Sequence, residues 1–87
     1  MDMDAQFRAL MDLAEVLGFE IRSAPSVETQ RAGALVKIHN KEVVFLDFSA
    51  PLIDRILLLA EILRGRDELQ QMYIVPELRR LIETGQL

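Results

Sequence analysis

The chain of 87 residues contains few side chains that could carry out chemistry. It has one histidine, His39, and no cysteine, so disulfides, thiolate nucleophiles, thiolate zinc sites and iron–sulfur clusters are excluded. A Ser-His-Asp arrangement needs a basic imidazole beside its nucleophile, but His39 stands between two β-branched runs, where a hairpin turn is expected. We therefore interpret His39 as a turn residue, and we expect neither a catalytic centre nor a cofactor.

The acidic side chains offer one alternative chemistry. Asp47, Asp54 and Glu61 could approach one another near the start and the exposed side of a central helix, and carboxylate oxygens are the ligands that Mg²⁺ and Ca²⁺ prefer. The sequence therefore leaves open a small metal binder or metal-dependent enzyme that uses these three residues. The simpler interpretation is a solvated helix face on which Glu61 and Arg64 form a local pair, worth roughly a few tenths of a kcal/mol.

Phosphate recognition finds little support. The four glycines are isolated along the chain, so no glycine-rich phosphate loop is present. The net charge is −4 and the ten basic residues are scattered, which argues against binding to a nucleic-acid backbone. Four arginines could still gather at the C-terminal end of the molecule and contact phosphates, although cations there also favour a helix dipole. They are Arg64, Arg66, Arg79 and Arg80.

Length and composition predict a single folded domain that spans residues 1–87. Apolar residues make up 51% of the chain and charged residues 28%, far from the composition of disordered chains. The periodicities predict an α+β fold. It consists of an N-terminal helix, a short antiparallel sheet of about three strands with a β-hairpin, an apolar central helix, and one or two short C-terminal helices.

The N-terminal helix is expected from Asp4 to Leu17, because apolar residues recur there at helical spacing. Asp4 can cap its free N–H groups, and Gly18 can adopt the left-handed conformation that ends a helix, with Phe19 folding back on the last turn. A short strand should follow at residues 19–22. Residues 23–33 show no periodicity and are predicted to form an exposed loop.

Two β-branched and aromatic runs, Ala34–Ile38 and Glu42–Phe48, predict the hairpin. With Asn40-Lys41 as a two-residue turn, Val36 would face Phe45 on the side expected to be core. A three-residue turn would exchange the strand faces, so the register stays open. The opposite face is also apolar, which predicts that something covers it.

The remaining elements are helical. Leu52–Leu63 is predicted to form an apolar helix that stops at Gly65. Leu58 falls on its polar side, and together with Ile62 it indicates cover by the C-terminal segment or by a partner. The spacing of Asp67 and Gln70 predicts a capping box and a short helix. A last helix is expected from Pro76 to Thr84 and should end at Gly85.

Surplus apolar surface favours a protein partner. A domain of this length buries only about 60% of the surface that its unfolded chain exposes, so a second subunit would add stability. We expect a homodimer or a hetero-protein partner. The candidate interface residues lie on the second sheet face and around the central helix; they are Leu35, Leu46, Phe48, Leu58 and Ile62.

The sequence also predicts the cellular compartment of the protein. The first residues, Met1 to Asp4, are acidic where a secretory signal would be basic. The longest apolar stretch, residues 51–63, is interrupted by charges and is shorter than the ~20 residues that cross a bilayer. We expect a cytoplasmic protein without membrane contact.

Several segments carry a resemblance to a known family. Leu13–Ile21, Gly33–Lys37, Val43–Asp47, Pro51 and the helix with Leu59–Leu63 resemble the N-terminal scaffold of ImmA/IrrE-type zinc metallopeptidases, over roughly residues 7–65. That family carries HExxH on this helix, where two histidines bind zinc and the glutamate activates water. Here the corresponding positions read Glu61, Ile62 and Gly65. The resemblance therefore implies a catalytically silent relative, and we expect a non-catalytic protein–protein interaction or regulatory module.

Overall fold

The computed structural model describes residues 1–24 and 32–87, so most of the predicted loop at 23–33 lies outside the described residues. The described part confirms the α+β fold and contains three α-helices, one 3₁₀ helix and three strands. In chain order these are α1 (Met3–Val16), β1 (Glu20–Ser23), β2 (Gly33–Ile38), β3 (Lys41–Leu46), α2 (Leu52–Arg64), η1 (Asp67–Gln71) and α3 (Pro76–Thr84).

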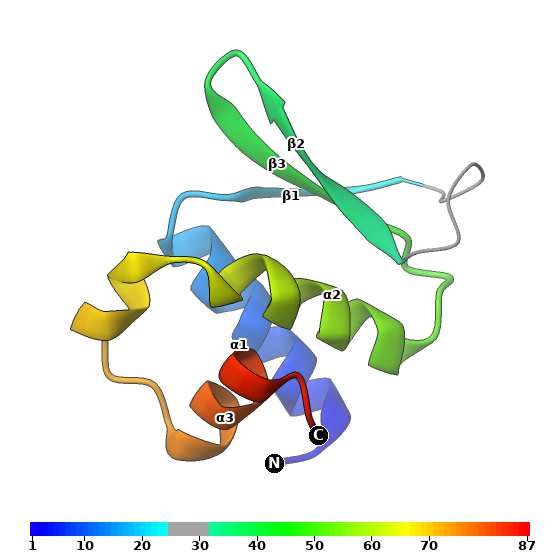
Figure 1. Ribbon diagram of the computed structural model, residues 1–87. Coiled ribbons are helices and arrows are strands. Elements are labelled where there is room, and N and C mark those ends of the chain that lie inside the picture. Colours follow the sequence, from blue (N-terminus) through cyan, green and yellow to red (C-terminus); the bar gives the residue numbers. More distant parts are fainter. Residues whose placement is uncertain (25–31) are drawn as a thin grey trace.

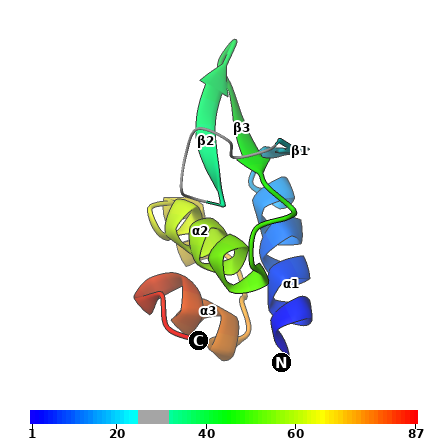
Figure 2. The same ribbon diagram turned by 90° about the vertical axis from the view of Figure 1, so that its right-hand side faces the viewer.

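The elements are stacked in layers (Figure 1). The sheet forms one layer, and α1 and α2 lie side by side beneath it, with α2 under the beginning of β2 and α1 on the β1 side (Figure 2). Helix α3 packs against α2 on the side away from the sheet. The far end of the β2–β3 hairpin extends beyond the helices (Figure 1). The core therefore lies between one sheet face and the helix layer.

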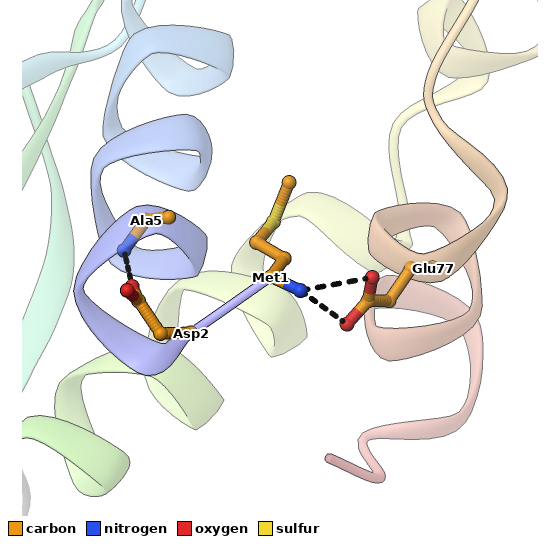
Figure 3. A network of polar contacts seen from close by, with 4 residues as sticks. All are labelled: Met1, Asp2, Ala5 and Glu77. Atoms are coloured by element: carbon orange, nitrogen blue, oxygen red, sulfur yellow. Dashed lines mark hydrogen bonds and ion pairs between the residues drawn. The ribbon is translucent and has the colours of Figure 1, made fainter.

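Both ends of α1 follow from local chemistry, with one correction. The helix is capped by Asp2 and not by Asp4, because the side chain of Asp2 accepts a hydrogen bond of 2.7 Å from the N–H of Ala5 (Figure 3). At the other end Gly18 has a φ of 96°, and the N–H of Phe19 donates to the carbonyl of Ala14. These contacts form a Schellman motif, as the sequence predicts.

The sheet is mixed, whereas an antiparallel sheet was expected. Its strand order is β1-β3-β2, with β1 parallel to β3 and β2 antiparallel to β3. The chain leaves β1 and enters β2 at the same end of the sheet, so the two strands flank β3 and run in opposite directions. The periodicity of a strand does not reveal its neighbours, which is why its direction could not be predicted.

The hairpin turn lies one residue earlier than expected. His39 and Asn40 form it, with φ values of 50° and 65°, the left-handed pair that a two-residue type I′ turn requires. Val36 consequently pairs with Val43 and not with Phe45. The shift leaves the same residues on each face but corrects which face is core: Val44 and Leu46 belong to the core cluster, on the face that the helices cover.

The central and C-terminal helices lie close to the predicted ranges. Helix α2 ends at Gly65 and α3 at Gly85, whose φ is 69°. Leu58 is only 5% exposed, so it is covered as its apolar character requires. The cover comes from the beginning of β2, directly above it, and not from the C-terminal segment or a partner as expected. The predicted capping box is also wrong: η1 starts after Arg66 without a side-chain cap.

Candidate functional site

A groove runs between the beginning of β2 and the C-terminal half of α2. It has a volume of about 500 Å³. Leu35 of β2 is 43% exposed at its rim, while Leu58 of α2 is almost completely buried and Ile62 is half-buried. The residues that line it are Gly33, Ala34, Leu35, Leu58, Glu61, Ile62 and Gly65. The walls are therefore mainly aliphatic side chains and glycine backbone, which suits an apolar ligand.

Gly33 allows β2 and β3 to approach closely at the end of the groove. A Cβ atom at this position would overlap the carbonyl oxygen of Phe45 in β3, and it would stand 3.1 Å from Cδ2 of Leu58. Only glycine avoids both contacts. Gly33 consequently lets the strand start directly over α2.

One edge of β2 pairs with β3, and among the described residues no strand pairs with the other edge. The N–H of Asp47 donates to the carbonyl of Ala32 over 2.7 Å. In an antiparallel pair, hydrogen-bonded residues alternate along the strand with residues whose backbone groups point outward. The alternation that starts at Ala32 turns the N–H and C=O groups of Gly33, Leu35 and Lys37 toward the free edge.

The five candidate interface residues separate into three places. Leu35, Leu58 and Ile62 meet in the groove. Leu46 is 0% exposed and is part of the core, so it does not belong to any exposed surface. Phe48 is 45% exposed and packs edge-on against Phe7, with ring centroids 6.1 Å apart.

The candidate metal ligands are not brought together. Within residues 1–24 and 32–87, no group of three or more histidine, aspartate or glutamate side chains is close enough to hold a metal ion. Oδ1 of Asp47 accepts a hydrogen bond of 2.9 Å from the N–H of Ser49 in the turn before α2. Glu61 lines the groove instead. The arrangement of Asp47, Asp54 and Glu61 therefore gives no support to a carboxylate metal site.

Three of the four candidate arginines line one small cavity, and the fourth does not. Arg64, Arg66 and Arg79 surround a space of about 70 Å³ at the end of α2, whereas Arg80 lines another cavity. Nε of Arg64 donates to the carbonyl of Ile82 over 2.7 Å. Nη2 of Arg79 donates to the carbonyls of Leu69 and Met72 over 3.0 and 2.9 Å. These guanidinium groups tie backbone segments together, which is a structural role.

Charged side chains form two further sets of contacts, one between the sheet and the residues after α2 and one within the sheet. Arg66 pairs with Glu42 of β3 and stacks 4.5 Å from the ring centre of Phe19. Glu20 of β1 binds Arg22 and Lys41, and these contacts, Arg22 first, lower the pKa of its carboxyl group. All of these groups lie outside the groove, whose lining residues include one titratable side chain, Glu61.

A separate ion pair joins the N-terminal residue, just before α1, to α3. The amino group of Met1 lies 3.5 Å from Glu77 in the first turn of α3 (Figure 3). Glu77 is exposed, so the pair adds little to stability.

Among the described residues no helix is both long and apolar enough to cross a membrane.

Comparison with known proteins adds no identification. No protein-family model matches the chain, and no curated protein or solved structure matches it. The resemblance to the zinc metallopeptidases therefore stays a prediction from the sequence.

Proposed function

We propose that this protein is a non-catalytic protein–protein interaction module that binds its partner in the groove between β2 and α2. The observation that carries the proposal is that an edge of β2 with no paired strand among residues 1–24 and 32–87 lies beside an aliphatic groove. Unpaired backbone groups and exposed apolar side chains each favour association, and here they face the same space.

The predicted resemblance supports the same surface. Glu61, Ile62 and Gly65 stand where the metallopeptidases would carry HExxH, and all three line the groove. A carboxylate (Glu61) and a glycine (Gly65) in place of the two zinc-binding histidines, and an isoleucine (Ile62) in place of the catalytic glutamate, leave a binding groove without a hydrolytic centre. The proposal therefore describes a catalytically silent relative in which the former site face contacts a partner.

A phage-displayed library of linear peptides tests the proposal. The parent protein should select peptides rich in aliphatic residues, and Ile62→Asp should lose them because it places a carboxylate in the groove. Val16→Asp is the matched control, because Val16 is 70% exposed on α1 and does not line the groove. Peptides that bind the parent and Ile62→Asp equally well would contradict the proposed surface.

A further inference from the structure

The groove also indicates which kind of segment would occupy it. Exposed strand edges accept extended chains, whose main-chain hydrogen bonds give affinity while pockets for alternate side chains give specificity. Gly33, Leu35 and Lys37 of β2 direct their backbone groups toward the free edge. This inference rests on the proposed function above and specifies the chemistry of the partner.

Two side chains of β2 define the pattern that a ligand strand would meet. Leu35 and Lys37 are two residues apart and lie on the same sheet face as Val44, the face that is turned toward α2. Leu35 borders the aliphatic groove formed with Leu58 and Ile62. Lys37 is exposed beyond it, and Glu42, its cross-strand neighbour in β3, pairs with Arg66. The edge thus offers one apolar position followed by one positive charge.

We propose that the occupant is an extended segment of a partner protein that joins β2 as an antiparallel strand. It places an aliphatic residue opposite Leu35 and an acidic residue opposite Lys37. Because the added strand runs against β2, the acidic residue comes two positions before the aliphatic one. Opposite charges on directly facing residues stabilise strand pairs, so this pair would set the register of the ligand.

A segment fits this edge better than a second copy of the whole chain. The sequence of β2 is Gly-Ala-Leu-Val-Lys-Ile and contains no acidic residue. Two copies joined antiparallel through β2 would therefore place no carboxylate opposite Lys37 in any register. A separate segment can carry an acidic residue at that position and an aliphatic residue opposite Leu35.

The test uses a capped peptide of about eight residues with alternating threonine and valine, and with glutamate two positions before a central valine. Its binding to the parent protein is followed by fluorescence anisotropy. N-methylation of the central valine should weaken binding about tenfold, because the N–H of this valine would donate a hydrogen bond to the backbone carbonyl of Leu35. N-methylation of the next threonine is the control and should have little effect, since that N–H points away from β2.

Charge exchange tests the register independently of folding. Lys37→Glu should reverse the preference, so that a peptide with lysine in place of glutamate binds about two- to tenfold better than the original peptide. Equal effects of the two N-methylations, or an unchanged charge preference, would overturn the inference. If library peptides still depend on Ile62 in that case, the proposed function stands. If no peptide binds the groove at all, both are wrong.

Discussion

Single residues explain why the sheet and the groove have their present shape. Gly33 is the clearest example. Any side chain at this position would overlap the backbone carbonyl of Phe45 in the neighbouring strand, whereas the backbone conformation of Gly33 itself does not demand glycine. Leu58 shows the same dependence from the other side, since its side chain is only 5% exposed and the beginning of β2 lies directly above it.

We expect Gly33→Ala to destabilise the fold by about 1–3 kcal/mol, because the added methyl group would force β2 away from β3. Urea unfolding measures the loss. Gly65→Ala is the control, because a Cβ atom at Gly65 would have no heavy atom within 4 Å, and its φ is −88°. An equal loss in both variants would contradict the proposed contact with Phe45.

The Glu20 carboxyl group should titrate below its ordinary value of 4.5, because Arg22 and then Lys41 favour its charged form. A lowered pKa in the folded state means that these ion pairs stabilise the fold above pH 4.5, and that the contribution is lost as the pH falls through the lowered pKa. NMR titration of the side chain measures this pKa. Arg22→Gln should raise it more than Lys41→Gln, and an unchanged pKa in both variants would refute the assignment.

At the scale of elements, helix ends are set by a few local contacts. Gly18 and Phe19 end α1, and Gly85 ends α3 in the left-handed conformation. The start of α1 is less obvious from the sequence, because two aspartates stand two residues apart and either could serve as the cap. The observed hydrogen bond to Ala5 selects Asp2.

Asp2→Ala should therefore lower stability by about 0.5–2 kcal/mol, the usual effect of removing an N-cap. Asp4→Ala should cost less, because Asp4 lies in the first turn, where its charge interacts only with the helix dipole. Thermal unfolding of both variants compares them directly. The cap assignment would be wrong if Asp4→Ala were the more damaging change.

The hairpin illustrates how far local signals extend. Its two strands and its two-residue turn were predictable, since β-branched runs flank a turn residue that tolerates a positive φ. The turn position was wrong by one residue, because His39 also adopts a positive φ, which non-glycine residues seldom do. Both strand faces are apolar, so periodicity could not tell which one meets the helices.

At the scale of the whole molecule, the fold covers much of the apolar surface that favoured a homodimer. Leu46 and Leu58 are buried by the chain's own elements. We therefore expect light scattering across a dilution series to give the mass of a monomer, 9.9 kDa. A dimer that Leu35→Glu dissociates would instead show that the groove side is a contact between copies of this chain.

The candidate site was predicted only in part. Leu35, Leu58 and Ile62 were selected because they are apolar where solvent was expected, and these three do meet in one groove. Leu46 and Phe48 were selected on the same ground but lie elsewhere, since alternation along a strand cannot show what packs beyond it. No sequence signal indicated that Gly33 and Gly65 would shape the groove.

The sequence by itself determined the helices, the existence of the hairpin, the α+β class and the chemistries that the chain lacks, because these depend on residue types and on contacts within a few positions. Only the tertiary structure decided the parallel pairing of β1, the core face of the hairpin and the groove. Those features depend on contacts between residues far apart along the chain, such as Gly33 with Phe45 and Leu58, which no local pattern encodes.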